Sequence, residues 1–463
     1  KVQPSECTLN RVMDNIKQLN QLGLFDAKVP RYTSYPTAPQ FTTGIHAKEF
    51  EAWLRAVTPG SAISLYLHIP FCRRLCWFCA CRTQGVSKDA PVLSYLKTLK
   101  DELAMVAAAL PKDVTLSRLH WGGGTPTILS AEAITSLATA IRAVLPFAPA
   151  AEFSVEIDPS EVDDARLDAF AGAGMNRASI GIQDFDPKIQ AAIGREQSYE
   201  LTSDVADKLR ARGIHSLNTD ILYGLPFQDA GSIADTTRKL LSLNPDRVAL
   251  YGYAHVPWMA RRQTMIPEDK LPTAMERLVL ANTARDLFLA AGYRAIGIDH
   301  FAKVGDGLDV AARSGKLRRN FQGYTDDTCD TLIGLGASAI SKLPQGYVQN
   351  ASATASYVAQ IRDDKFASAR GHASTDDDKL RARVIEEIMC TFQVSLSKVE
   401  AELDVIPVDL RAEFARVQQK FAHYANFDGD RLSLTPKGQL LARMVAREFD
   451  VYAMNEQGHS LAI

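Results

Sequence analysis

The chain has 463 residues, of which 46% are hydrophobic and 23% are charged, and its formal net charge is −2. This length exceeds one ordinary hydrophobic core, so we expect a large catalytic domain with a smaller domain attached. The near-neutral net charge does not indicate binding to nucleic acid or to an anionic membrane surface. No apolar run is long enough to span a bilayer. The first residues lack the basic-then-apolar order of a secretory signal, so we expect a cytoplasmic protein.

Six short apolar runs predict the strands of the larger domain. They span residues 63–70, 117–124, 152–159, 177–184, 217–226 and 247–254. Each is followed by an amphipathic stretch of helical length, for example 89–110 and 130–145, the latter opening on the N-cap residue Ser130. These repeats predict an α/β fold with a parallel sheet, either closed into a barrel or partial barrel or open as a doubly wound sheet.

Polar and glycine residues stand where these strands end. They are His68, Gly122 to Gly124, Glu156, Gln183, Asp220 and His255. The carboxyl ends of parallel strands meet at one edge of the sheet, where α/β enzymes build their active sites. We therefore expect an active site inside the mouth of a barrel or partial barrel.

The composition divides the chain into three parts. We expect residues 1–45 to form an N-terminal arm or lid, 46–365 the barrel with its extensions, and 366–463 a mainly helical C-terminal domain with a short strand within 430–449. A polar, acidic stretch at 361–380 suits a linker at the second boundary. A winged-helix-like pattern in the last part raises DNA binding as an alternative. However, from residue 375 onward 15 acidic residues outnumber 11 basic ones, which disfavours a phosphate-binding surface.

Four of the seven cysteines lie within ten residues, at Cys72, Cys76, Cys79 and Cys81. This density indicates metal or redox chemistry rather than disulfides. A tetrahedral zinc site usually joins two separated cysteine pairs, whereas a single loop suits one face of an iron–sulfur cluster. Three ligands at the spacing C-x3-C-x2-C would leave one iron of a 4Fe–4S cubane open to another ligand. The remaining cysteines are expected to be ordinary small hydrophobic residues: Cys7, Cys329 and Cys390.

This loop follows the first predicted strand and carries the aromatic Phe78 before its third cysteine, and it resembles the radical S-adenosylmethionine (SAM) superfamily. The resemblance implies a partial (β/α)6 barrel and a 4Fe–4S cluster held by Cys72, Cys76 and Cys79. It also implies a 5′-deoxyadenosyl radical made from SAM. A wider set of motifs resembles the oxygen-independent coproporphyrinogen III oxidase family. They are VPRYTSYPTAPQF (29–41), LHIPFCRRLCWFCAC (67–81), HWGGGTPT (120–127), VEIDP (155–159), GIQDF (181–185), DILYGLP (220–226), YAHVP (253–257) and RNFQGYT (319–325).

The family resemblance implies two bound SAM molecules. Positions matching the first SAM site are Tyr66, Gly123, Glu156 and Ile340. Positions matching the second are Phe78, Gly124, Thr125, Gln183, Arg195, Asp220 and Ala254. Without the resemblance, Arg195 would be interpreted as a solvated surface charge and Glu156 equally well as a salt-bridge partner. The glycine run before Thr125 could offer backbone N–H groups to a ligand.

Tyr66 and His68 alternate in the first predicted strand, so both should face the barrel interior, where we expect catalytic roles for them. A satisfied core histidine is the alternative for His68. Cys81 is expected near the cluster rather than on it. Because the implied substrate carries four propionates, a further set is expected to bind it, although each arginine could instead form a structural ion pair. The set is Arg31, Arg319 and Gln322.

The implied reaction is the oxidative decarboxylation of two propionates of coproporphyrinogen III to vinyl groups, giving protoporphyrinogen IX in haem biosynthesis. It requires an electron donor for the cluster and an unidentified electron acceptor. We expect no nucleic-acid partner, no membrane span and a monomer. The alternatives are a radical SAM haem-modifying methyltransferase and a haem-binding chaperone related to the family. The complete N-terminal motif, Cys81 and the full second-SAM set favour the oxidase.

Overall fold

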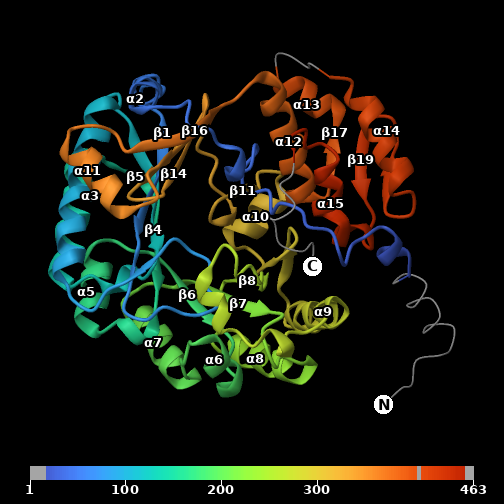
Figure 1. Ribbon diagram of the computed structural model, residues 1–463, viewed down its shortest axis with the longest axis horizontal. Helices are drawn as coiled ribbons and strands as arrows, with labels where there is room; N and C mark the ends of the chain where they lie inside the picture. Colours follow the sequence, from blue (N-terminus) through green and yellow to red (C-terminus); the bar gives the residue numbers. More distant parts are fainter. Residues whose placement is uncertain (1–16, 404–407, 454–463) are drawn as a thin grey trace.

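The computed structural model describes residues 17–403 and 408–453, and a single twelve-stranded sheet dominates it (Figure 1). Six parallel strands form its centre and lie in chain order across the sheet. They are β1 (Ala62–Ile69), β4 (Thr115–Gly123), β5 (Phe147–Ile157), β6 (Arg177–Gln183), β7 (Ser216–Tyr223) and β8 (Arg247–Gly252). All six predicted strands are confirmed.

Helices follow these strands and cover the outside of the curved sheet (Figure 1). They are α3 (Ala90–Ala109), α4 (Ala131–Val144), α5 (Asp164–Gly172), α6 (Pro187–Ile193), α7 (Tyr199–Ala211), α8 (Ala230–Ser242) and α9 (Ala274–Ala290). Ser130 caps α4 as predicted, because its side chain accepts the N–H of Ala133. The largest buried apolar cluster fills the space between strands and helices, and includes Leu65 and Leu67 of β1. The predicted partial (β/α)6 barrel is therefore the observed fold.

Additional strands extend the sheet at both edges. Beyond β8 lie the antiparallel strands β10 (His300–Ala302) and β9 (Arg294–Ile296). Beyond β1 lies the parallel strand β13 (Leu332–Leu335), followed by three antiparallel strands. These three are β14 (Ile340–Leu343), β15 (Gly346–Asn350) and β16 (Ser368–Ala373).

The remaining elements are short or belong to the C-terminal domain. Around the barrel they are α2 (Ala47–Arg55), β2 (Phe71–Cys72), β3 (Gln84–Gly85), α10 (Gly307–Arg313), β11 (Arg318–Asn320), β12 (Gly323–Thr325) and α11 (Thr354–Arg362). The 3-10 helices are η1 (Ala38–Gln40), η2 (Pro126–Ile128), η3 (Pro159–Glu161), η4 (Arg261–Met265), η5 (Glu268–Lys270) and η6 (Gly438–Leu441).

The C-terminal domain is mainly helical, as predicted, and lies beside the barrel (Figure 1). Its helices are α12 (Asp376–Thr391), α13 (Leu396–Glu402), α14 (Leu410–Lys420) and α15 (Ala442–Arg447). The single strand expected within 430–449 is β19 (Arg431–Leu434). It lies between β17 (Gln393–Ser395) and β18 (Ala425–Phe427) in a three-stranded antiparallel sheet.

The stretch predicted as a linker, 361–380, is mostly regular structure, so that prediction is wrong. Strand β16 pairs with β15 and extends the barrel sheet to Ala373, past the expected boundary at 365/366, and α12 begins at Asp376. The polar composition has a different cause: β16 is the edge strand of the sheet, and only Ser368 and Gly371 of its six residues are buried.

The described part of the N-terminal arm spans from the C-terminal domain to the barrel (Figure 1). Leu19, Leu24, Tyr32 and Tyr35 belong to the apolar core of the C-terminal domain. Farther along, the Phe41 ring stacks on that of a barrel residue, Tyr347, with 5.5 Å between centroids. The arm therefore connects the two domains.

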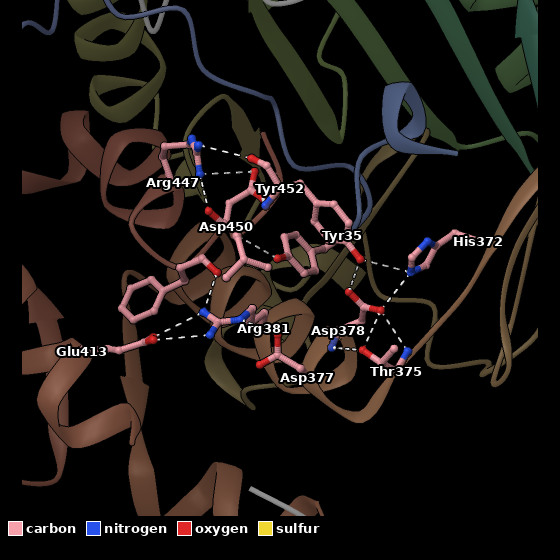
Figure 2. A network of polar contacts seen from close by, with 12 residues as sticks. Tyr35, His372, Thr375, Asp377, Asp378, Arg381, Glu413, Arg447, Asp450 and Tyr452 are labelled. Carbon is pink, nitrogen blue, oxygen red and sulfur yellow. Dashed lines mark hydrogen bonds and ion pairs between the residues drawn. The ribbon is translucent and has the colours of Figure 1, made fainter. Parts of the chain in front are cut away.

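A polar network fixes this connection (Figure 2). Asp378 at the start of α12 accepts hydrogen bonds from Thr375 and from the Tyr452 hydroxyl, at 2.7 Å for Tyr452, and lies 2.8 Å from Nε2 of His372 on β16. Tyr35 of the arm accepts the N–H of Val451 at 3.2 Å. The network thus joins the arm, the edge of the barrel sheet and the C-terminal segment.

A second network behind β1 surrounds the buried carboxyl of Glu102 on α3. Its oxygens accept hydrogen bonds from Gly336 N–H, the Asn350 amide and the Tyr357 hydroxyl at 2.7, 2.6 and 2.7 Å. Burial nevertheless raises the pKa of Glu102 from 4.5 to about 7. The native state therefore holds a proton there that the unfolded chain releases between these two pH values.

This raised pKa predicts a pH-dependent loss of stability. Glu102 contributes fully to stability below about pH 4.5, and the contribution is lost as the pH rises through about 7. At about 1.4 kcal/mol per pKa unit, the free energy of unfolding should fall by about 3 kcal/mol between pH 4.5 and 8, relative to Glu102→Gln. Urea unfolding of both proteins across this range measures the difference. Identical pH profiles would contradict the prediction.

Candidate active site

A loop after β1 carries the four clustered cysteines. The short parallel pair of β2 and β3 holds its two ends together, with Cys72 opposite Gly85. Cys72 and Cys76 are buried, Cys79 is half-buried and Cys81 is exposed, and all four are free thiols. The loop lies at the carboxyl end of the barrel strands, as predicted.

The surroundings of Cys79 favour the thiolate form that binds iron. Hydrogen bonds from the side chain and the N–H of Cys81 lower the pKa of Cys79. The Arg195 guanidinium donates to the sulfur of Cys76 at 3.6 Å. Burial raises the pKa of the third thiol, Cys72, although hydrogen bonds to Thr125 and Thr83 oppose the rise. The donor set therefore fits a cluster held by Cys72, Cys76 and Cys79.

The zinc alternative finds no support in this geometry. Within residues 17–403 and 408–453, no three His, Cys, Asp or Glu side chains converge as the ligands of one metal ion would.

A cavity of about 670 Å³ opens beside this loop at the mouth of the barrel. Many of the predicted site residues line it, from the strands, the arm and the β11–β12 hairpin. They are Arg31, Tyr66, His68, Gly123, Glu156, Asp220, Arg319, Gln322 and Ile340. The structure thus brings together all four positions matched to the first SAM.

Tyr66 and His68 both face this cavity, as the strand alternation predicts. His68 Nε2 lies 3.1 Å from the carbonyl oxygen of Arg82, which only accepts, so Nε2 carries a proton. Burial lowers the pKa of His68 and favours the neutral ring, in which Nδ1 accepts the Tyr66 hydroxyl at 3.1 Å. His68 therefore ties the end of β1 to the chain that leaves the cysteine loop.

Two glycines allow the β4 turn to approach β1. A Cβ on Gly123, whose φ is +110°, would lie 2.3 Å from the His68 ring, and one on Gly124 would lie 2.6 Å from the Phe71 carbonyl oxygen. The expectation of free N–H groups is corrected, because each already has a protein acceptor. Gly123 N–H donates to Glu156 at 2.9 Å, and those of Gly124 and Thr125 donate to carbonyls at the end of β1 and in β2. Gly123 and Gly124 therefore allow the β4 turn to pack closely against the end of β1.

Glu156 and Asp220 provide the acidic groups on the barrel interior. Besides accepting from Gly123, Glu156 lies 3.4 Å from His120 Nε2. Burial raises the pKa of Asp220 to about 6, and hydrogen bonds from Asn218 and Ser179 oppose this. Both carboxylates can accept hydrogen bonds from a ribose or an ammonium group of a ligand.

Apart from Asp220, the residues matched to the second SAM are not among those that line the cavity. Gln263, which the sequence analysis missed, connects two of them: its amide donates to the carbonyls of Phe78 at 2.8 Å and Ala254 at 3.1 Å. Gln183, at the end of β6, adopts φ = +69°. No motif distinguishes Gln263, since its role depends on contacts distant in sequence.

Arg195 is buried, so its interpretation as a solvated surface charge is wrong. Beyond Cys76 it contacts Asp158 at 3.4 Å, the Gly181 carbonyl at 2.8 Å and Gln197 at 3.0 Å. Its Nε is buried and has no partner in the described structure. An arginine with a free buried donor beside a ligand thiol fits the expected cofactor site.

The predicted substrate arginines differ in their surroundings. Arg319 has a 3% exposed side chain, pairs with Asp299 at 3.6 Å and donates from Nε to the Arg31 carbonyl at 3.2 Å. Arg31 donates its own side chain to the Gly252 carbonyl at 2.9 Å. Gln322 is exposed on the cavity wall. Arg319 thus has the structural ion pair considered as its alternative.

Five arginines line the cavity, including three that the sequence analysis missed: Arg82, Arg177 and Arg247. Carboxylates neutralise three of the five: Arg177 pairs with Glu152 at 2.8 Å, Arg247 with Asp306 at 2.7 Å and Arg319 with Asp299. Arg31 and Arg82 have no carboxylate partner in the described part of the chain. These two can bind the carboxylates of a ligand.

Comparisons with known proteins agree with this site. Residues 66–240 match the family model described as the radical SAM superfamily. The oxygen-independent coproporphyrinogen III oxidase of Paracoccus denitrificans is 56% identical over 97% of this chain and 100% of its own, and that of Salmonella typhimurium is 38% identical over 91% and 93%. No helix among the described residues has the length and apolar character to cross a membrane.

A solved structure gives the same result for the fold. The coproporphyrinogen III oxidase of Escherichia coli, described as a radical SAM enzyme, superposes with a TM-score of 0.87. It is 36% identical and covers 92% of this chain and 100% of its own. The cysteine loop, the barrel mouth and nearly full-length similarity together show that this chain belongs to the oxygen-independent coproporphyrinogen III oxidase family of radical SAM enzymes.

Proposed function

We propose that this chain converts coproporphyrinogen III to protoporphyrinogen IX without dioxygen, by oxidative decarboxylation of two propionates to vinyl groups. The observation that carries the proposal is the cavity of about 670 Å³, which reaches the cysteine loop at Cys81 and contains two arginines without carboxylate partners among the described residues. Bound 4Fe–4S cluster and SAM supply the one-electron chemistry and the hydrogen abstraction. The chain supplies binding, orientation and shielding from water.

Each group of residues has a separate task in this proposal. Cys72, Cys76 and Cys79 hold the cluster, and the protonated Arg195 offers its buried Nε–H beside them. Glu156 accepts hydrogen bonds from the first SAM, while Tyr66 and His68 shape the adjacent wall. The arm contributes Arg31 to the cavity and restricts access to it, which limits quenching of a radical.

We also propose two bound SAM molecules. The first set, Tyr66, Gly123, Glu156 and Ile340, lines the cavity together. Members of the second set contact the cysteine loop: Gln263 connects Phe78 of the loop with Ala254, and Arg195 donates to Cys76. Equilibrium dialysis of the anaerobic holoenzyme with labelled SAM counts the molecules bound, and a stoichiometry of one would contradict this. A monomeric state and a cytoplasmic location also stay predictions.

An anaerobic assay tests the function. Reconstituted protein, dithionite, SAM and coproporphyrinogen III are incubated, and the oxidised porphyrins are separated by chromatography. Protoporphyrin is the expected product. A methylated tetrapyrrole would indicate the methyltransferase alternative, and tight haem binding without turnover would indicate the chaperone.

Arg31→Gln is expected to weaken substrate binding. Losing a charged hydrogen bond to a propionate costs about 1.5–3 kcal/mol, so KM should rise about tenfold to a hundredfold while kcat changes less. Arg31→Lys should recover part of the loss, because it keeps the charge without the planar fork. Arg238→Gln on the exposed face of α8 is the control. An unchanged KM in Arg31→Gln would remove Arg31 from the substrate site.

A further inference from the structure

A second hollow, which we call the loop groove, lies at the end of the cysteine loop. Its volume is about 390 Å³. Three segments form most of its wall: residues 80–84 at the end of the cysteine loop, residues 256 and 259–262 leading into η4, and residues 352–354 before α11. It shares Cys81 and Arg82 with the inner cavity.

The loop groove is positively charged. Arg82, Arg261 and Arg262 line it, and no Asp or Glu is among its lining residues. The whole chain carries a net charge of −2, so this charge is a local feature. Met259, with 58% of its surface exposed, adds apolar area. Arginine and methionine are enriched in the cores of protein interfaces, whereas acidic residues are depleted there.

Hydrogen bonds connect an arginine of the loop groove, through Thr83, to the predicted cluster ligand Cys72. Arg262 donates to the Cys81 carbonyl at 3.1 Å and to the Thr83 hydroxyl at 3.0 Å. Thr83 also hydrogen-bonds the thiol of Cys72. A protein seated in the loop groove would therefore lie directly over the loop that holds the cluster.

We propose that the loop groove is the docking surface for a small acidic one-electron carrier protein that reduces the cluster. The inference rests on the proposed function, whose chemistry begins with a reduced cluster. One electron leaves the carrier, which is oxidised, and enters the cluster, which is reduced; no other bond changes. Complementary charge accelerates such an encounter and makes it sensitive to salt.

The test compares two reductants on the anaerobic holoenzyme. A flavodoxin, as an acidic flavoprotein, is supplied in its fully reduced form, and dithionite serves as the reductant that needs no docking surface. The variant is Arg261→Glu, because Arg261 is exposed and lines only the loop groove. Arg238→Glu on α8 makes the same charge change elsewhere. Flavodoxin affinity is measured by calorimetry, and the rate of cluster reduction by stopped-flow absorbance.

Arg261→Glu should weaken flavodoxin binding at least about tenfold at low salt and slow flavodoxin-driven cluster reduction to match. Dithionite-driven reduction and SAM binding should stay within twofold of the wild type, and Arg238→Glu should behave as wild type in every measurement. Unchanged affinity in Arg261→Glu, or equal loss with both reductants, would overturn the proposal. So would a wild-type protein that does not bind flavodoxin, or one that forms a dimer which Arg261→Glu abolishes.

These readouts are separate from porphyrin formation. If the porphyrin assay fails while flavodoxin affinity still depends on Arg261, the proposed substrate is wrong and the docking surface stands. If protoporphyrin forms with dithionite but Arg261→Glu leaves the affinity for flavodoxin unchanged, the proposed docking surface is wrong and the proposed function stands.

Discussion

Cys76→Ser is expected to abolish both the 4Fe–4S cluster and protoporphyrin formation. Cys76 is buried in the middle of the loop, and its sulfur accepts the Arg195 hydrogen bond at 3.6 Å. A serine hydroxyl is a poor replacement for a thiolate, and a cubane held by two cysteines loses most of its protein attachment. Iron and sulfide analysis, with electron paramagnetic resonance of the reduced protein with and without SAM, measures the loss.

Two other cysteines provide matched controls. Cys329→Ser should leave iron content and the SAM-dependent spectrum unchanged, because Cys329 lies beside Asp327, away from the loop. Cys81→Ser should keep the cluster but shift its spectrum, since the substitution alters the side-chain hydrogen bond of Cys81 to Cys79 and leaves the three expected ligands in place. If Cys76→Ser kept a full cluster while Cys81→Ser lost it, the assignment of ligands would be wrong.

Arg319→Met is expected to destabilise the protein by about 3–5 kcal/mol, the usual result of removing one partner of a buried ion pair. Burial raises the pKa of Asp299, yet Arg319 and His300 hold it down to about 2. Without Arg319, the buried Asp299 carboxylate loses its arginine partner and keeps only its contact with His300 at 2.6 Å, and the Arg31 carbonyl loses its donor. Chemical unfolding at pH 7 measures the change in free energy.

The charge explanation predicts a specific rescue. Asp299→Asn in the Arg319→Met background removes the buried carboxylate charge and should recover most of the lost stability, so the two substitutions should be strongly non-additive. Additive losses would show that packing of the Arg319 side chain, which lies 4.4 Å over the Tyr324 ring, is the larger contribution. Catalytic measurements on Arg319 variants are meaningful only beside these stability data.

The sequence predicts the barrel well because its signal is local. Alternation of apolar runs with helical stretches, and caps such as Ser130, identify the six strands and their order without any knowledge of long-range contacts. The prediction of a linker at 361–380 is wrong for the opposite reason, because the signal that identifies strand β16 is not local. An edge strand solvated on one side has the composition of a loop, and only its pairing with β15 distinguishes β16.

The residues of the candidate site also fall into two groups, those that short sequence segments predict and those that depend on long-range contacts. The spacing of Cys72, Cys76 and Cys79 and the alternation of Tyr66 with His68 are readable from short segments. By contrast, Gln263 contacts Phe78 across 185 positions, and Arg195 contacts Cys76 across 119. Such pairs depend on how distant segments meet in space, so composition and spacing cannot identify them. The family resemblance supplied Arg195, and the structure alone supplied Gln263 and Arg262.

The main sheet has one further consequence for ligand size. Its outermost strands, β16 and β9, do not pair with each other in the described chain, so the sheet is an open arc, and Thr42 of the arm exchanges backbone hydrogen bonds with Gly371 at its β16 edge. A closed barrel of eight strands fills its own centre with side chains. The interior of this arc instead holds the cavity of about 670 Å³, and Arg31 of the arm and the β11–β12 hairpin complete its wall, so the incomplete closure leaves room for a ligand inside the sheet.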